Sequence, residues 1–196
     1  MPMATVSPST SVLDVIRSRR SVPRLKPDPV PRELIAQLLD AAVWAPNHRL
    51  TEPWKFFVLA GQSKRRFAEI RRDFRRTQLP NPDAAEVQAA LEKVYRDAAE
   101  TPVIIAVTSH VADDPEQREE DFWATYGAAY AFMLGAWSHG LGTYFRTGAL
   151  RDYPPFRQLL GLPPDHRIIG VIYAGYPVEV PQRRRTPAAE KTVWLE

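Results

Sequence analysis

The chain has 196 residues, of which 44% are hydrophobic and 25% are charged; these proportions are typical of a globular protein, and the length suffices for one domain with a substantial core. The formal net charge of +3 is mild, and no apolar run is long enough to cross a bilayer. The chain contains no cysteine, which excludes disulfides, thiolate metal sites and thiol nucleophiles and fits a cytoplasmic protein.

The first third of the sequence predicts two helices after a short leader. We expect residues 1–11 to be a flexible leader, without the apolar segment of a signal peptide, and residues 12–196 to form a single domain. Ser11 is typical of the N-cap of a first helix. A proline-rich extended segment separates this helix from a second one, which begins at Pro31 and stops before the next proline.

Two strands and two helices come next. The apolar run at residues 55–60 predicts a mostly buried strand, and Ser63 is expected to cap the helix that follows it. A further helix over residues 84–100 precedes a continuous apolar run at residues 103–108. Such a run is typical of a central strand, covered on both faces.

The second half begins with an acidic segment, residues 113–121, expected to loop into the longest helix, over about residues 119–139. A short strand at residues 143–145 and a buried strand at residues 168–174 follow. Helices therefore precede and separate four strands, which predicts a three-layer α+β fold with one core.

A polar loop bounded by prolines connects the second helix to the first strand. Pro46 and Pro53 remove backbone donors and disfavour helix in the residues before them. The residues between them carry amide, imidazole, guanidinium, hydroxyl and carboxylate groups. A short, rigid polar loop is a common place for binding groups, and the alternative is a capping turn with ordinary surface side chains.

Three further segments suggest that the chain binds an anion or a flat ring. The two guanidiniums and the hydroxyl of Arg19-Arg20-Ser21 suit a phosphate, although the helix dipole also favours a basic C-terminus. In Arg146-Thr147-Gly148 the glycine lets the backbone approach a flat ligand closely. Arg183-Arg184-Arg185 adds positive charge to the tail, where the alternative is a solubilising basic end.

The sequence offers little for nucleic-acid or metal binding. Residues 64–76 carry seven basic and two acidic side chains, but the lack of stacking aromatics on the basic side favours a solvated helix over a phosphate-tracking face. The four histidines have neither the paired spacing nor the cysteines of common metal sites, so no metal is expected.

Taken together, four of these motifs resemble the FMN-dependent nitroreductase family, in its small single-domain branch. They follow the family's order over nearly the whole chain: Arg19-Arg20-Ser21, Ala45-Pro46-Asn47-His48 with Glu52-Pro53-Trp54, Gly140-Leu141-Gly142 with Phe145-Arg146-Thr147-Gly148, and Gly175-Tyr176-Pro177 with the tail arginines. The resemblance implies a central, mostly antiparallel sheet flanked by helices. It also implies a homodimer that binds FMN at its interface and takes NADH or NADPH as reductant.

The resemblance also implies roles for residues at the matching positions. Arg19, Arg20 and Ser21 would hold the phosphate and the pyrimidine side of FMN, and Arg183 and Arg185 would add phosphate contacts. A second group would reach the FMN of the other subunit, namely Trp44, Pro46, Asn47 and His48. A third group would lie along the isoalloxazine ring and present a backbone N–H to its N5 atom, namely Phe145, Arg146, Thr147 and Gly148.

Two positions depart from the pattern of many family members. Leu50 stands where many have asparagine, and we expect an apolar contact from it. Glu52 stands where many have glutamine, and its carboxylate is expected to disfavour anionic substrates.

The implied function is an NAD(P)H oxidoreductase that reduces nitroaromatics, quinones or similar electron-poor acceptors by a ping-pong hydride mechanism. No catalytic acid or base is assigned: His48 is a candidate proton donor, but an orienting hydrogen bond is the favoured role. Two alternatives stay open, an FMN-binding sensor or carrier without turnover, and a basic nucleic-acid-binding module built on residues 64–76.

Overall fold

The structure is a computed structural model that describes residues 11–195. The predicted leader, residues 1–11, therefore lies outside the described residues except for Ser11. The elements are, in chain order and with η for 3₁₀ helices, α1 (Val12–Ser18), α2 (Arg32–Ala42), η1 (His48–Leu50), β1 (Trp54–Leu59), α3 (Gly61–Arg76), α4 (Ala85–Ala99), β2 (Val103–His110), α5 (Pro115–Ser138), β3 (Gly142–Arg146), η2 (Ala149–Asp152), α6 (Pro154–Leu159), β4 (His166–Gly175) and η3 (Ala188–Lys191).

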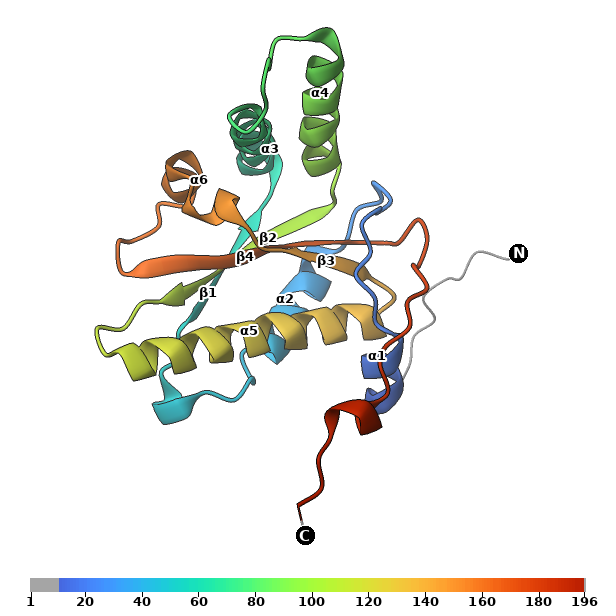
Figure 1. The fold of residues 1–196 in the computed structure, drawn as a ribbon, viewed down its shortest axis with the longest axis vertical. Helices are drawn as coiled ribbons and strands as arrows, with labels where there is room; N and C mark the ends of the chain where they lie inside the picture. The colour runs from blue at the N-terminus through green and yellow to red at the C-terminus, as the bar shows by residue number, and fades with distance from the viewer. Residues whose placement is uncertain (1–10, 196) are drawn as a thin grey trace.

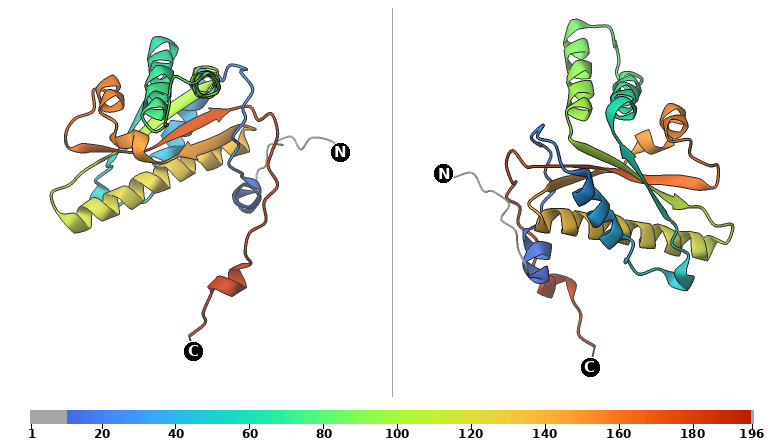
Figure 2. Two further views of the ribbon diagram at one scale, coloured as in Figure 1. Left: turned by 45° about the horizontal axis from the view of Figure 1, so that its top comes forward. Right: turned by 180° about the vertical axis from the view of Figure 1, so that it is seen from behind.

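An antiparallel sheet in the order β1-β2-β4-β3 forms the middle layer. Helices α2 and α5 cover one face, and α3, α4 and α6 cover the other (Figures 1 and 2). This arrangement confirms the predicted three-layer α+β fold with an antiparallel sheet. Within residues 11–195, no helix has the length and apolar character needed to cross a membrane.

The two apolar layers arise from the alternation of side chains along the central strands. On β2, Ile105 packs with α2 and α5, whereas its neighbour Ile104 packs with α3, as expected when successive side chains point to opposite faces. Both are fully buried, which confirms β2 as the predicted central strand. Small residues let α2 approach α5, since a Cβ atom at Gly135 would lie 3.0 Å from Leu38.

The first strand and the helix after it differ from expectation in detail. β1 is an edge strand and is not mostly buried, because Lys55 is exposed and Val58 is 45% exposed. Ser63 lies in the first turn of α3 and not at its N-cap. Its hydroxyl accepts a hydrogen bond from the N–H of Ala60 at 3.1 Å, so it satisfies the backbone from inside the helix.

The longest helix begins earlier than predicted. Asp114 is its N-cap, and the Asp114 carboxylate accepts a hydrogen bond from the N–H of Gln117 at 2.8 Å. Pro115 occupies the first turn, where the lack of a backbone donor costs nothing. The acidic segment at residues 113–121 is therefore mostly helical, and both signals for this start were present in the sequence.

Candidate functional site

A basic cavity lies where the end of α1 meets the C-terminal tail, and we call it the tail cavity. It has a volume of about 500 Å³ and is lined by Ile16, Arg17, Arg19, Arg20, Tyr130, Arg183 and Arg185. The structure thus brings the arginines after α1 together with those of the tail, and among residues 11–195 no acidic residue lines the cavity. Such an arginine cluster suits a phosphate.

Two of these arginines have unmet hydrogen-bonding capacity. The Nε atoms of Arg19 and Arg20 are buried and have no hydrogen-bond partner among the described residues. The guanidinium of Arg19 lies 5.8 Å from the centre of the Tyr130 ring, so the ring forms one wall beside it. A buried donor without a partner is costly, and the cavity therefore fits an anion that accepts from these groups.

A second cavity, of about 450 Å³, lies beside the outer edge of β3, and we call it the strand-edge cavity. Its walls come from the segment after α1, from β3 and β4, and from the end of α4: Pro23, Arg24, Leu25, Tyr144, Arg146, Tyr173, Val178, Lys93, Asp97, Glu100 and Thr101. Ser21 pairs with Thr143 in a parallel bridge, and the N–H of Val22 donates to the Thr143 oxygen at 2.8 Å. Residues 19–25 thus run from the tail cavity to the strand-edge cavity along β3.

The two β3 side chains predicted along the flavin ring point to opposite faces of the sheet. Phe145 packs toward α5, where its ring centre lies 5.2 Å from that of Tyr126. The guanidinium of Arg146 lies over the rings of Tyr144, at 4.7 Å, and Tyr173, at 5.0 Å. A flat ligand bound at the edge of β3 could therefore contact the Arg146 side chain on the α3 face of the sheet and the Phe145 side chain on the α5 face.

The chain turns immediately after β3, at Thr147 and Gly148. Gly148 has a φ of 140°, a conformation that favours glycine. A third cavity, of about 400 Å³, opens beside this turn, and we call it the turn cavity; it is lined by Arg71, Phe74, Arg75, Gln78, Val94, Arg146, Thr147, Gly148, Ala149 and Leu150. Burial lowers the pKa of Arg146, and the charge of Arg71 lowers that pKa further.

The proline-bounded loop has an unusual backbone. Arg49, Leu50 and Glu52 have φ angles of 59°, 53° and 43°, in the left-handed region that side-chain-bearing residues rarely adopt. The Oδ1 atom of Asn47 accepts a hydrogen bond from the N–H of Glu52 at 3.0 Å, which closes the loop on itself. Such strain persists only where surrounding contacts enforce it, and it is common at functional sites.

Side chains of α5 tie the same loop to the body of the protein. The Nδ1 atom of His48 lies 2.7 Å from Oε2 of Glu120. The hydroxyl of Thr51 donates to Oδ1 of Asp121 at 2.6 Å, and Asp121 is buried. Contacts within the chain thus fix the shape of the loop.

Within one chain, the loop and the cavities lie apart. None of Trp44, Pro46, Asn47 and His48 lines the tail, strand-edge or turn cavity. The loop contacts α5 near its N-terminus, whereas α1 lies against its C-terminal end (Figures 1 and 2). Trp44 is 87% exposed and Leu50 is 81% exposed, so the loop presents two large apolar side chains to the outside.

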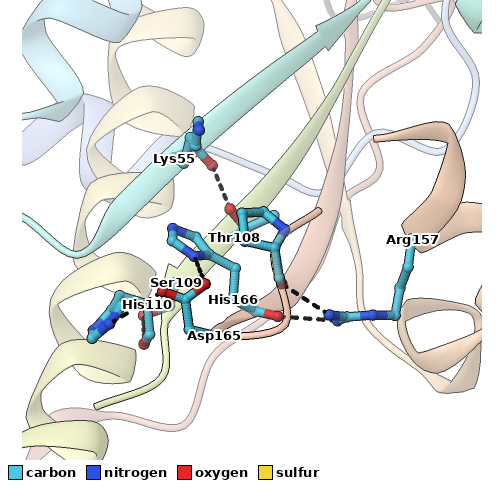
Figure 3. Close-up of polar contacts among 8 residues, drawn as sticks. Lys55, Thr108, Ser109, His110, Arg157, Asp165 and His166 are labelled. Atoms are coloured by element: carbon cyan, nitrogen blue, oxygen red, sulfur yellow. Dashed lines mark hydrogen bonds and ion pairs between the residues drawn. The ribbon is translucent and has the colours of Figure 1, made fainter. Parts of the chain in front are cut away.

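A separate polar cluster holds β2 and β4 together at their far ends. Asp165 lies between two histidines, with Oδ1 3.2 Å from Nδ1 of His166 and Oδ2 3.8 Å from Nε2 of His110 (Figure 3). Arg157 donates to the backbone oxygens of His166 and Pro163 at 3.0 and 3.1 Å. Over residues 11–195, no group of three or more potential ligands is placed to hold a metal ion. The contacts of the cluster join the ends of β2 and β4, which is a structural role.

Sequence reasoning missed several residues that line the cavities. The sequence patterns place Tyr130 only within the longest predicted helix and Tyr173 only within a predicted strand. Arg71 and Arg75 were expected only as members of the basic run, yet both line the turn cavity. Their spacing of four residues places them on one helix face, which is the signal that could have grouped them.

Comparisons with known proteins agree with this fold. The Nitroreductase family pattern matches residues 16–176. YfhC of Bacillus subtilis, whose name describes an NAD(P)H nitroreductase, is 31% identical over 194 residues, which cover 97% of this chain and 98% of YfhC. The crystal structure of a nitroreductase-like family protein from Bacillus cereus is 31% identical, with a TM-score of 0.82 and coverage of 97% and 98% of the two chains.

A more distant structure shows the same fold. The FMN-dependent nitroreductase NfnB from Mycobacterium smegmatis, solved in complex with NADPH, is 17% identical, with a TM-score of 0.72 and coverage of 94% of this chain and 97% of that one. The family pattern covers most of the chain, and the Bacillus relatives match it nearly end to end. The chain therefore belongs to the nitroreductase family and is an oxidoreductase of that type.

Proposed function

We propose that the protein is an FMN-dependent NAD(P)H oxidoreductase that reduces nitroaromatics, quinones or similar electron-poor acceptors. The observation that carries the proposal is the adjacency of two cavities along residues 19–25, one lined by five arginines and the other beside the edge of β3. NADH or NADPH as the reductant is supported by the name of YfhC and by the NADPH complex of NfnB. The lack of cysteine supports a cytoplasmic location.

The residues present fit FMN at both of its ends. Arg19, Arg20, Arg183 and Arg185 would hold the phosphate in the tail cavity, where hydrogen bonds to charged groups contribute about 1.5–3 kcal/mol each. The edge of β3 and the turn at Gly148 would offer backbone groups to the ring. When bound, FMN would supply the hydride chemistry, and the protein would hold and orient it.

His48 is proposed to orient the loop rather than to donate a proton. Its Nδ1 atom lies 2.7 Å from Oε2 of Glu120, so this nitrogen serves an orienting contact, and only Nε2 could meet a reactant. The bond fixes the tilt of the imidazole beside Asn47, which itself closes the loop. We accordingly assign no catalytic acid or base.

A homodimer would complete the site. The loop lies at one end of α5 and the arginines near the other, so a two-fold axis across α5 would bring the loop of one chain to the cavities of the second. Exposed aromatic side chains mark the surface of α5 available for this contact: Trp123 is 65%, Tyr126 is 48% and Tyr130 is 38% exposed. Exposed apolar patches of this kind are typical of subunit interfaces.

Replacing Arg19 tests the phosphate assignment. Arg19→Ala is expected to weaken FMN retention about tenfold or more, because it removes one charge-assisted contact. The measurement is the flavin absorbance that survives dialysis, followed by anaerobic addition of NADPH, which should bleach wild-type protein. Arg184→Ala is the matched control, since Arg184 lies in the same tail but does not line the cavity.

Two outcomes would count against the proposal. Full flavin occupancy in Arg19→Ala after dialysis would remove the phosphate site from the tail cavity. Yellow wild-type protein that is not bleached by NADH or NADPH would indicate the sensor or carrier alternative instead.

A further inference from the structure

The turn cavity has an unbalanced charge. Its wall contains Arg71, Arg75 and Arg146, and no aspartate or glutamate. A smaller pocket shares Arg71, Arg146 and the turn with this cavity and adds Arg151 and Tyr173. The acid beside Arg146 and Tyr173 is Asp97, which lines the strand-edge cavity and neither of these two. Like charges in a shared hollow repel, and an anion bound between them would relieve that repulsion.

The basic residues of α3 divide into two groups. On the outside of the helix, Arg66 pairs with Glu69 at 2.7 Å and Arg72 pairs with Asp73 at 2.8 Å. Arg71 and Arg75 form no ion pair in the part of the chain that the structure describes; Arg71 donates to the backbone oxygen of Val94 at 3.3 Å. Lys64 and Arg65 also form no ion pair among the described residues, but of these unpaired members only Arg71 and Arg75 line the turn cavity.

Two buried polar atoms beside Arg71 also have no partner within residues 11–195. They are Nε of Arg146 and the hydroxyl of Tyr173, and only 5% of Tyr173 is exposed. Arg71 and Arg146 lie on the Tyr173 ring, at 5.5 and 5.0 Å from its centre. The Arg71 guanidinium, the Arg146 guanidinium with its unpaired Nε, and the Tyr173 hydroxyl therefore belong to residues that line the smaller pocket together, a set of groups suited to an oxyanion.

We propose that the turn cavity binds a carboxylate or phosphate carried by a reactant, either the acid group of the electron acceptor or the 2′-phosphate of NADPH. The inference rests on the proposed function, because it places this group beside Gly148, where the flavin ring is expected to end. Glu52, expected to disfavour anionic substrates, lines none of the three cavities within its own chain. In the proposed dimer its loop would approach them from the second chain, so the three arginines would have to outweigh its charge. The protein would accordingly prefer acidic acceptors, or NADPH over NADH.

Binding calorimetry on the purified protein tests this without turnover. The probes are 4-nitrobenzoate with its uncharged match 4-nitrobenzamide, and adenosine 2′-phosphate with its match adenosine. Wild-type protein is expected to bind at least one acid about tenfold more tightly than its match. Arg71→Gln and Arg75→Gln are expected to reduce that ratio about fivefold, and Arg66→Gln, on the paired side of α3, to leave it unchanged.

The outcomes distinguish the two possible anionic reactants from each other and from failure of the inference. If the arginine variants lose the preference for 4-nitrobenzoate over its amide, the ligand is an acidic acceptor. If they lose the preference for adenosine 2′-phosphate over adenosine, the ligand is NADPH. Equal binding of acid and match, or a ratio untouched in the exposed and structurally mild Arg75→Gln, overturns the inference. Flavin colour and bleaching by NADPH are recorded on the same samples, so failure of the proposed function is visible independently.

Discussion

At the scale of single residues, Gly170 decides how closely β3 packs on β4. A Cβ atom there would lie 2.6 Å from two ring atoms of Phe145 and 2.9 Å from the backbone oxygen of Arg146. We predict that Gly170→Ala lowers the free energy of unfolding by about 1–3 kcal/mol, because the backbone oxygen cannot move aside without shifting the strand. The check is the midpoint of denaturant unfolding.

Gly127→Ala is the control for that substitution. A Cβ atom at Gly127 would lie 3.7 Å from the Cβ of Ala45, an ordinary contact, and alanine is favoured over glycine inside a helix by about 1 kcal/mol. The Gly127 variant should therefore unfold at the wild-type midpoint or above it. Equal midpoints for Gly170→Ala and the wild type would show that β3 tolerates displacement.

Asp165 gives the fold a dependence on pH. The hydrogen bond from His166 holds the pKa of Asp165 below its ordinary value of 3.8, and desolvation opposes this effect. A carboxyl with a lowered pKa stabilises the fold above its unfolded pKa, and the stabilisation is lost as the pH falls through the folded value. We predict that Asp165→Asn lowers the melting temperature at pH 6 and that the difference from wild type shrinks as the pH falls below 3.8.

The control for the pH series is Asp113→Asn. Asp113 is exposed, and it is its backbone oxygen that accepts from Arg118. The difference between this variant and the wild type should not follow the same curve between pH 6 and pH 3. A pH-independent effect of Asp165→Asn would mean that the cluster in Figure 3 acts through packing alone.

At the scale of elements, the sequence patterns were enough to predict the order and kind of α1 to α5 and of the four strands, but not the three 3₁₀ helices. They could not predict that β1 is half exposed, because its apolar run, including Phe56 and Phe57, has the same composition as a central strand. What exposes β1 is its place at the edge of the sheet, where it pairs only with β2. That place is set by pairing between segments far apart in the sequence, which no local pattern specifies.

The alternation of β3 refines one expectation about the site. Adjacent residues of a strand point to opposite faces, so Phe145 and Arg146 cannot both lay their side chains on the same side of a ligand. The structure places Phe145 with α5 and Arg146 with Tyr144 and Tyr173. If both residues contact the flavin ring, their side chains would do so from opposite faces of the sheet. That contact stays a prediction.

At the scale of the whole molecule, the tail cavity is assembled from the two ends of the described chain. Each arginine group had a local alternative explanation, a helix C-terminus for one and a solubilising tail for the other. Only the resemblance to a known family joined them to a single phosphate. The fold supports this union by placing both groups around one hollow.

The exposed loop leads to a prediction about assembly. Trp44 is 87% exposed in one chain, so Trp44→Ser should cost little stability in an isolated subunit. If the loop contacts a second chain, the same change should raise the dissociation constant of the dimer by roughly 30-fold or more, as loss of a buried interface tryptophan does. Sedimentation equilibrium measures this constant.

The matched control for assembly is Val58→Thr, at a 45% exposed position of β1 outside the loop. It should leave the dissociation constant unchanged. A wild-type protein that sediments as a monomer, or a Trp44 variant that associates as tightly as wild type, would remove the loop from the proposed interface.

The tail cavity combines arginines at the end of α1 with arginines of the tail, and this has a practical consequence. A protease that cuts the tail before Arg183 would remove two of the five arginines that line the tail cavity, while the sheet and the helices that cover it stay intact. The cleaved protein would keep its melting temperature but release FMN. A stored preparation would then lose its yellow colour without unfolding. A phosphorylated ligand bound in the tail cavity would in turn hold Arg183 and Arg185 in place and slow cleavage of the tail.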